Sequence, residues 1–567
     1  MRIAVAVTSP DGGILRPLAA DGTPAGPPRH TADLIGAIAT LERTDRPRWV
    51  WPATHLIYPR LLRAGVRLAQ CHDLELVEAL LLGHAARHGE PRSVAAAYAR
   101  LRGTEVPGDV PGPGAEVGAG GQPSLFDQAS EPTADDIEAV VAVHHDQLRR
   151  IASLEHPDRM GLLAAAESAG GLIAAEMTHH GLPWRAEVHD RLLTELLGPR
   201  PAGSGRHGPG LRPRRLQALA DEIVAAFDGR PVNPDSPAQI VRAFGAAGIS
   251  VPSARSSVLR GIDHPAVAPL LEYKELARLH AAHGWGWLDT WVRDGRFRPE
   301  YIVGGVVSGR WATRGGGALQ IPKVLRRAVV ADPGWVLVVA DAAQLEPRVL
   351  AALAGDEAFA AAAAHGDLYT ALADAFGGAR AKAKIALLSA MYGGATGDAI
   401  SLLGVLRQRF PAAAGYVEAA ARAGEAGHIV RSRLGRTCPP PSAAWRERVA
   451  GVAGGAAARS RGRFTRNFVV QASAADWALA LLALARRRLA EQAPPAPAGG
   501  ERHLAAGPQL VFFQHDELIV HSPKEHADAV VAAISAAAAD AGRLVFGSTP
   551  VVFPLETAVV DCYADAK

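Results

Sequence analysis

The sequence predicts a multidomain α+β protein, and three observations lead to this fold class. The chain has 567 residues, which is too long for one hydrophobic core and suits three or four domains. Apolar residues make up 48% of it, enough for globular cores. Stretches rich in Gly and Pro divide the chain at 103–134, 198–214 and 493–508, because such low-complexity sequence cannot bury enough surface to order itself.

The blocks between these stretches differ in pattern. Residues 1–150 open with the strand-like RIAVAV and alternate short strands with helices, which predicts a small α/β domain. Residues 151–300 carry helical periodicity, as in LLEYKELARLHAAHG. Residues 301–567 mix the strands WVLVVAD and QLVFFQHDELIVHS with long helices, so we expect a sheet with helices inserted between its strands.

Composition narrows the class of protein only slightly. A net charge of +3 neither implies nor excludes a nucleic-acid partner. Cys71, Cys438 and Cys562 form no paired spacing, which suits a reducing cytoplasm and argues against a zinc or disulfide framework. The N-terminus does not resemble a signal peptide, and outside Ala-rich helix no apolar run reaches the length of a membrane span. We therefore expect a cytoplasmic protein without a membrane partner, and a monomer.

Acidic residues stand at the ends of two strand-like segments. Asp341 ends a predicted buried strand that begins at 334, and Asp516 with Glu517 interrupts the predicted hairpin FFQHDELIV. A capping residue and a solvated turn are the simplest interpretations. If the strands are neighbours, however, the carboxylates could together hold two Mg²⁺ ions that clamp the attacking and leaving oxygens of a phosphoryl transfer.

A basic helix is predicted at 380–393. Arg380, Lys384, Leu388 and Tyr392 recur every fourth residue and share one helical face. Such a face could bind a triphosphate at one end and stack on a base at the other. A solvated amphipathic helix is the alternative.

A second basic segment, at 308–331, carries no acidic residue, which suits sequence-independent contact with phosphates. Its cationic residues are Arg310, Arg314, Lys323, Arg326 and Arg327.

Several segments, in order along the chain, resemble the motifs of the family A DNA polymerases, the DNA polymerase I type. VVADAAQLEPRVLAALAGD is similar to motif A, RAKAKIALLSAMYGG to motif B and FFQHDEL to motif C. Smaller likenesses lie around them: EYKELARL, SGRWATRGGGALQIP, GHIVRSRLGRTCPP and RFTRNFVVQASAADW. The arrangement resembles in particular a bacterial short form in which a 3′–5′ exonuclease-type domain precedes the polymerase.

This resemblance implies a right-hand polymerase fold of palm, fingers and thumb, with fingers at about 355–430 and a ribonuclease H-like exonuclease-type domain at the N-terminus. It implies a template-directed DNA polymerase in repair or replication-associated gap filling. The implied partners are primer–template DNA and dNTPs, and the implied cofactor is Mg²⁺ as two ions, with Mn²⁺ as a substitute.

The resemblance also assigns roles to residues. The implied metal ligands are the Asp341 and Asp516 carboxylates and the Ala342 carbonyl, with Glu517 in support. Lys384 would be the general acid for the leaving pyrophosphate. Glu346 would be a steric gate against a ribonucleotide 2′-OH. The remaining nucleotide-binding residues are Gln344, Leu345, Arg380, Leu388, Tyr392 and His515, and the DNA-binding residues are Arg310, Arg348, Arg463, Asn467 and Gln471.

The chain departs from the family pattern at several positions. Ala342 or Ala343 replaces the motif A Tyr, Leu388 replaces the motif B Phe, and Ser389 replaces the Gly after it. Two alternatives follow: a catalytically decayed DNA-binding scaffold, and a ribonucleotide-tolerant polymerase related to single-subunit RNA polymerases. The retained Gln344-Leu345-Glu346 favours deoxynucleotides.

The acids of a 3′–5′ exonuclease are missing from the N-terminal block. That chemistry needs four acids around two metals, but Asp11 stands alone near the first strand. Asp135 and Asp136 could match the third segment, although Pro132 occupies the place of the expected Tyr. We therefore expect an exonuclease-like domain that is inactive.

The loop GQPSLFDQ carries Gln122, Leu125 and Phe126. These residues resemble the short peptide by which bacterial polymerases and repair proteins bind the sliding clamp, a known mode of recognition. A loop that folds back onto its own domain is the alternative.

Overall fold

The computed structural model describes residues 1–109, 136–202, 212–364, 366–392, 398–451, 454–492 and 507–566; the side chains of residues 375, 376, 390, 392 and 398–403 are not described. The Gly/Pro-rich stretches predicted as linkers lie largely outside these ranges. The chain forms two compact units. Unit 1 comprises Met1–His179, Tyr301–Ala312 and Val338–Ala558, and unit 2 comprises His180–Glu300, Thr313–Leu337 and Val559–Lys567.

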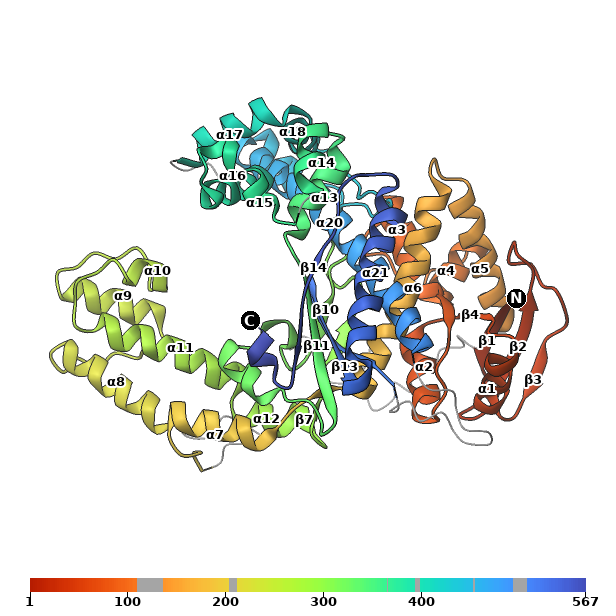
Figure 1. The fold of residues 1–567 in the computed structure, drawn as a ribbon, viewed down its shortest axis with the longest axis horizontal. Coiled ribbons are helices and arrows are strands. Elements are labelled where there is room, and N and C mark those ends of the chain that lie inside the picture. The colour runs from red at the N-terminus through yellow and green to blue at the C-terminus, as the bar shows by residue number, and fades with distance from the viewer. Residues whose placement is uncertain are drawn as a thin grey trace. The chain divides into compact units, whose positions relative to one another are not determined.

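A mixed five-stranded sheet forms the N-terminal part of unit 1 (red in Figure 1), in the order β3-β2-β1-β4-β5. β1 pairs antiparallel with β2 and parallel with β4, and β4 is parallel to β5. The apolar run at the start of the chain forms a strand, as the sequence predicts, and this strand is the central one of the sheet. The elements are β1 (Arg2–Val7), β2 (Gly13–Leu18), β3 (Arg29–Thr31), β4 (Arg48–Trp51), β5 (Gln70–Asp73), α1 (Leu34–Thr44), α2 (Thr54–Arg63), α3 (Leu74–His84), α4 (Val94–Arg102) and α5 (Ile137–Ala152).

A second, four-stranded sheet of order β12-β13-β11-β14 carries the C-terminal motifs. Its strands are β11 (Trp335–Ala342), β12 (Gln509–Gln514), β13 (Glu517–Pro523) and β14 (Leu555–Val560). The predicted hairpin exists, because β12 and β13 pair antiparallel with Gln514 opposite Glu517. The helix α21 (Ala527–Phe546) packs against β13.

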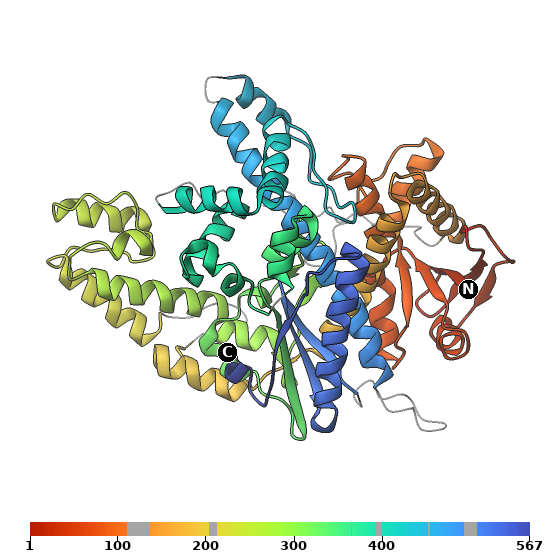
Figure 2. The same ribbon diagram turned by 45° about the horizontal axis from the view of Figure 1, so that its top comes forward.

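Two long helices connect the parts of unit 1. The first is α6 (Pro157–His180) and the second is α20 (Gly454–Glu491), a continuous helix of 38 residues that runs through the unit (light blue in Figure 2). They pack closely enough that a Cβ on Gly170 of α6 would lie 2.9 Å from Leu479 of α20. A larger side chain at Gly170 would therefore require the side chains of Leu479 and Val303 to shift.

A buried ion-pair network ties the N-terminal sheet to these helices. Glu176 of α6 accepts hydrogen bonds from Arg486 of α20 (2.6 and 3.0 Å), from Arg67 (3.1 Å) and from the Tyr58 hydroxyl (2.5 Å). Burial alone would raise the pKa of Glu176, but Arg486 and Arg67 outweigh it and hold this pKa well below its usual range. The carboxylate therefore stays charged, as a buried ion must when its partners are this close.

The helical segments after β11 belong to unit 1 and cover the region predicted as fingers. They begin with α13, which follows the strand directly, and α16 coincides with the helix predicted at 380–393. The elements are α13 (Leu345–Ala354), α14 (Glu357–Ala363), α15 (Leu368–Ala371), η3 (Ala373–Phe376), α16 (Arg380–Tyr392), α17 (Asp398–Arg409), α18 (Pro411–Glu425) and α19 (Ala443–Ala450).

Unit 2 is mainly helical, as the middle of the sequence predicts. Its long helices are α7 (Ala186–Leu197), α8 (Arg214–Ala226), α9 (Pro237–Ala246) and α11 (Val267–His283), with α10 (Ser256–Leu259), α12 (Trp285–Trp291), η2 (Lys323–Ala328), and the short strands β6 (Leu182–Pro183), β7 (Val292–Arg293) and β8 (Arg296–Phe297). An aromatic cluster of Trp184, Trp287 and Phe297 lies at the base of these helices, with ring centroids 4.8 to 5.6 Å apart.

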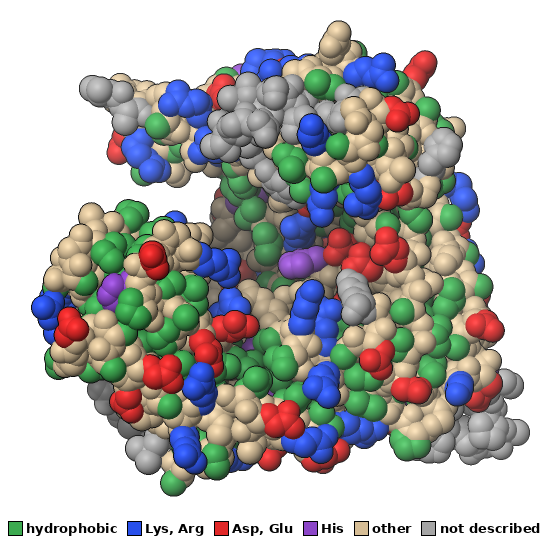
Figure 3. Space-filling view, turned by 60° about the vertical axis from the view of Figure 1, so that its left-hand side comes forward, with side chains coloured by type: hydrophobic (Ala, Val, Ile, Leu, Met, Phe, Trp, Pro, Cys, Tyr) green, Lys and Arg blue, Asp and Glu red, His purple; other side chains and the backbone are tan. Residues whose placement is uncertain are grey.

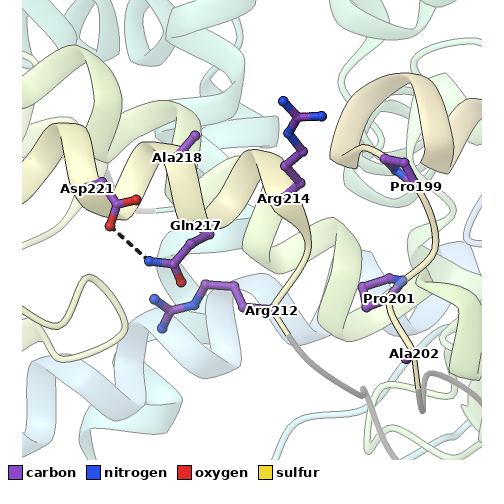
Figure 4. Close-up of a pocket in the computed structure, with 8 residues that line it drawn as sticks. All are labelled: Pro199, Pro201, Ala202, Arg212, Arg214, Gln217, Ala218 and Asp221. Atoms are coloured by element: carbon purple, nitrogen blue, oxygen red, sulfur yellow. Dashed lines mark hydrogen bonds between the residues drawn. The ribbon is translucent and has the colours of Figure 1, made fainter.

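A shallow pocket beside α8 also belongs to unit 2 (Figure 4). Gln217 on its wall donates a hydrogen bond to Asp221. None of the residues predicted to bind nucleotide, metal or DNA lines it; the lining is Pro199, Pro201, Ala202, Arg212, Arg214, Gln217, Ala218 and Asp221.

Within the described ranges, two helices are long and apolar enough to cross a membrane by length and composition, namely α20 and Lys524–Phe546. In α20, 89% of the most apolar window is buried inside the protein, and in the second helix 50% is. Core helices of soluble proteins pass the same test, and the burial of α20 is that of a core helix.

Candidate nucleotidyl-transfer site

The end of β11 and the tip of the β12–β13 hairpin meet. The Ala342 amide donates a hydrogen bond to the Asp516 carbonyl (3.0 Å), and β11 neighbours β13 in the sheet. Asp341 and Asp516 are therefore adjacent at one edge of the sheet, as the two motifs predict. Both residues are half-buried, and Glu517 beside them is buried.

Local sequence explains why these acids lie where they do. Residues 336–340 of β11 are at most 3% exposed, so this part of the strand is fixed in the core. The strand then ends at the edge of the sheet, where Asp341 lies. In the hairpin, His515 adopts a positive φ of 58°, which tightens the two-residue turn. This turn places the Asp516 carbonyl opposite the Ala342 amide.

His515 is exposed at the tip of the hairpin. Desolvation by the surrounding groups and the positive charge of Arg310 lower the pKa of His515, while Glu346 acts in the opposite direction. The imidazole is therefore biased toward its neutral form, which can both donate and accept a hydrogen bond.

The segment after Asp341 is held in an unusual conformation. Gln344 has a left-handed backbone (φ 55°, ψ 42°) and precedes the first residue of α13. Its amide nitrogen donates to Asp367 (2.9 Å), and its amide oxygen accepts from the Leu368 backbone (2.8 Å). The side chain that we predict to bind nucleotide thus also links the end of β11 to α15.

Glu346 and Arg310, predicted respectively as the steric gate and as a DNA contact, form an ion pair with each other. In unit 2, Arg314 of the basic segment pairs with Glu300 (3.2 Å), and Arg326 lies over the Tyr563 ring (4.4 Å). The charges of Arg310 and Arg314 are therefore neutralised by acids outside the basic segment, which a count of local charges does not reveal.

Arg348 is at odds with the role that we predict for it. The side chain is 0% exposed. It donates to the carbonyls of Ala343 (3.1 Å), Ala363 (2.7 Å) and Val552 (3.1 Å), and also to that of Gly366. A guanidinium whose donors are used in this way binds the α13–α15 connection to β11, and it is not available for DNA.

The face of α16 carries two exposed cations one turn apart. Arg380 is exposed and donates from Nε to Asp367 (2.8 Å), and Lys384 is exposed as well. Leu388 is half-buried. The side chain of Tyr392 lies outside the described part of the chain.

The predicted DNA-binding residues of α20 follow one another at intervals of four. Arg463 is exposed, and Asn467 and Gln471 are half-buried. In the amide orientation that its neighbours require, Asn467 donates to the Met391 carbonyl at the end of α16 (2.5 Å). This contact joins α20 to the helix that carries Arg380 and Lys384.

Asp367 and Tyr369 are site residues that sequence reasoning missed. Asp367 caps α15 and contacts both Gln344 and Arg380, and the Tyr369 ring lies under the Arg380 guanidinium (5.5 Å). The only sequence signal was a helix-capping Asp in GDLYT, which is common in helices that have no function in catalysis.

Among the described residues no group of three or more His, Cys, Asp or Glu side chains could hold a metal ion, either in the N-terminal block or around Asp341 and Asp516. Asp11 has a side chain 90% exposed, Asp73 is 2% exposed, and Asp136 caps α5. Asp135 and the predicted clamp-binding residues Gln122, Leu125 and Phe126 lie outside the described ranges.

The comparison with known families is decisive for the class of protein. The model of DNA polymerase family A matches residues 212–558, more than half of the chain. The chain belongs to this family.

Among curated proteins, it is similar to the thermostable DNA polymerase I of Thermus thermophilus, with 28% identity over 328 residues, or 52% of this chain and 36% of that protein. It is 28% identical to DNA polymerase I of Chloroflexus aurantiacus over 293 residues, or 47% of this chain and 29% of that protein. The chain thus spans about a third of the length of these relatives.

Among solved structures, the chain is similar to the POL domain of Pol1 from M. smegmatis in complex with DNA primer–template and dNTP. The match covers 100% of this chain and 95% of that one, with a TM-score of 0.70 and 18% identity. At this identity the match establishes the fold alone, and it extends over both units.

Proposed function

We propose that the protein is a template-directed DNA polymerase that adds deoxynucleotides to a primer 3′ end. The observation that carries this proposal is the Ala342–Asp516 backbone hydrogen bond, since it places Asp341 beside Asp516. Family membership supports the same activity, and the exposed cations of α16 supply the groups that a triphosphate requires.

The donor set at this edge fits divalent ions. Asp341, Asp516 and the Ala342 carbonyl are hard oxygen ligands, and Mg²⁺ is usually held by one or two carboxylates together with substrate phosphates. Two such ions would stabilise the attacking and leaving oxygens of the phosphoryl transfer. The family's use of divalent metals agrees with this donor set.

Side chains of the protein would bind the substrates and transfer the proton. Arg380 and Lys384 would bind the triphosphate, and Lys384 would give a proton to the departing pyrophosphate as the primer 3′ oxygen forms its bond to the α-phosphorus. Glu346, held by Arg310, would exclude the ribonucleotide 2′-OH. Arg463, Gln471 and His515 would contact primer, template or the nascent pair.

We infer that the N-terminal domain is exonuclease-like in fold and inactive. Its mixed five-stranded sheet is the architecture expected of a ribonuclease H-like domain. At the carboxyl end of β5, however, Asp73 accepts from the Thr54 and Leu76 amides (2.7 and 2.9 Å), and its own amide donates to Ser168 of α6 (3.1 Å). A carboxylate buried and used in this way supports packing rather than a metal site.

The cellular setting is also part of the proposal. A cytoplasmic, nucleoid-associated monomer in repair or gap filling suits the relatives. A sliding-clamp contact through Gln122, Leu125 and Phe126 is proposed from the sequence alone. These roles rest on the resemblance and not on the described residues.

Primer extension on a gapped duplex with Mg²⁺ tests the activity. We expect dNTP-dependent, template-directed extension by the wild type, little extension with rNTPs and no primer shortening when dNTPs are withheld. The double variant Asp341→Ala plus Asp516→Ala should lose extension while it still binds the duplex in fluorescence anisotropy. Tight DNA binding without extension by the wild type would favour the decayed scaffold, and equal use of rNTPs would favour the ribonucleotide-tolerant alternative.

A further inference from the structure

Asp367 lies between the two parts of the proposed nucleotide site. Asp367 directly precedes α15. Its carboxylate accepts hydrogen bonds from Gln344, which lies between β11 and α13, and from Arg380 of α16. One carboxylate oxygen accepts from the Gln344 amide (2.9 Å) and the Thr370 backbone (3.1 Å), and the other accepts from Arg380 Nε (2.8 Å). One oxygen thus contacts the start of α13 and the first turn of α15, and the other contacts α16.

The geometry at Arg380 leaves its binding end available. Asp367 uses the Nε hydrogen, and the Tyr369 ring, which is 6% exposed, supports the guanidinium from below at 5.5 Å. In the part of the chain that the structure describes, no other hydrogen bond of the Arg380 side chain is found. The two terminal nitrogens therefore remain for a ligand, and a guanidinium offers them to a phosphate as a fork.

Asp367 itself is rigidly placed and charged. The preceding segment is bound by Arg348, which donates to the carbonyls of Ala363 and Gly366. Burial opposes ionisation and would by itself raise the pKa of Asp367, but the hydrogen bonds from Arg380, Thr370 and Gln344 together outweigh it and hold this pKa well below its usual range. A fixed anion orients a flexible arginine and so lowers the entropy that the arginine loses on binding.

We propose that Asp367 is a positioning residue. It orients the Arg380 guanidinium toward the triphosphate of the incoming nucleotide, and it holds the Gln344 side chain beside the sugar of the same nucleotide. The proposal rests on the proposed polymerase function and adds to it a residue that touches neither substrate nor metal. Tyr369 acts with Asp367, because the ring restricts the guanidinium to one plane.

The variant Asp367→Ser tests this role. Serine caps a helix about as well as aspartate, so α15 should persist, but the short neutral side chain cannot hold Arg380. We expect the KM for dNTP to rise about 3- to 10-fold, with kcat changed less than about twofold. This 3- to 10-fold increase in KM corresponds to the loss of an exposed ion pair together with one hydrogen bond.

The variant Asp356→Ser is the matched control. Asp356 caps the neighbouring helix α14 and accepts from the Phe359, Ala412 and Ala413 amides, and none of its hydrogen-bond partners among the described residues is an arginine. It should alter stability but leave the KM for dNTP unchanged. A similar KM increase in both variants would show that loosening the helices is sufficient, and would overturn the proposal.

A double-mutant cycle separates positioning from folding. If Asp367 acts through Arg380, then adding Asp367→Ser to Arg380→Ala should raise the KM by less than about twofold beyond the single Arg380→Ala variant. Additive effects would overturn the proposal.

Failure of the proposed function can be told apart from failure of this inference. If the wild type does not extend a primer, dATP binding to the protein–DNA complex is measured by calorimetry with Ca²⁺ in place of Mg²⁺. Weaker binding by Asp367→Ser than by the wild type would then support the positioning role without catalysis. Equal affinities, or no binding by the wild type, would overturn it.

Discussion

At the scale of single residues, sequence motifs identify chemistry better than they identify contacts. Asp341 and Asp516 lie together as the motifs predict. Arg348, which belongs to the same motif as Asp341, is fully buried on carbonyl groups. A motif shows that a residue type is needed, but a buried structural arginine and a ligand-binding arginine look the same in sequence.

The role of Arg348 gives a stability prediction. Arg348→Met removes a buried cation and leaves four carbonyls without their donor, and each unsatisfied buried group costs about 1–3 kcal/mol. Because some of these carbonyls will find water, we expect the free energy of unfolding to fall by about 3–5 kcal/mol. Urea denaturation followed by circular dichroism measures it. Unchanged stability with weaker DNA binding would restore the role predicted from the motif.

Thiol reactivity tests the core at single residues. Cys71 and Cys438 are buried and Cys562 is half-exposed. Burial raises the pKa of Cys71 to about 12 and also raises that of Cys562. With iodoacetamide at pH 8, we expect mass spectrometry to find label first on Cys562, and on all three cysteines in urea. Rapid labelling of Cys71 in the native protein would contradict the N-terminal packing.

At the scale of elements, periodicity and strand length place the few helices and strands that the sequence analysis delimited, and contacts between elements decide how they are linked. The hairpin, β11 and α16 lie where the sequence predicts them. The link from Gln344 through Asp367 to Arg380 could not be predicted, because it joins three elements through side chains more than ten residues apart. The ion pair of Arg310 with Glu346 was missed for the same reason.

The network of α6 and α20 makes stability depend on pH. Glu176 has a lowered pKa in the folded state, so its contribution is present at neutral pH and is lost as pH falls below its unfolded value of about 4.5 toward the lower folded value. Glu176→Gln should therefore cost about 3–5 kcal/mol at pH 7.

The cost of Glu176→Gln should also shrink between pH 4.5 and pH 3. Urea unfolding of both proteins at each pH measures the difference and cancels the titration of the other carboxylates. A cost independent of pH would show that Glu176 is neutral in the folded protein.

Arg463 on α20 gives a prediction about DNA binding. The side chain is exposed, and we proposed above that it contacts primer, template or the nascent pair; a contact with a phosphate would make binding depend on salt. Arg463→Ala should weaken binding to all sequences alike, and reduce the slope of log K against log salt by about one. The variant Arg459→Ala, four residues earlier on the same helix, is the comparison that locates the contact. An unchanged slope for Arg463→Ala would exclude a phosphate contact.

At the scale of the whole molecule, charge predicts little about where a partner binds. On the face shown in Figure 3, Lys and Arg side chains are interspersed with Asp and Glu, which agrees with the small net charge. The family and the two sheets could be predicted from ordered motifs and strand patterns. The grouping of the N-terminal sheet with the C-terminal sheet in one compact unit could not, since it depends on long-range pairs such as Glu176 with Arg486.

The uninterrupted course of α20 has a consequence for how this chain can change. Arg486, near one end, belongs to the buried network, while Arg463 and Asn467, about six turns earlier, belong to the proposed DNA surface. Each residue inserted or deleted between them would rotate one end by about 100° relative to the other. The directions in which the side chains at the two ends point are therefore fixed relative to each other. We expect this stretch to accept substitutions but to tolerate insertions or deletions only in steps of about seven residues, which restore that relative orientation.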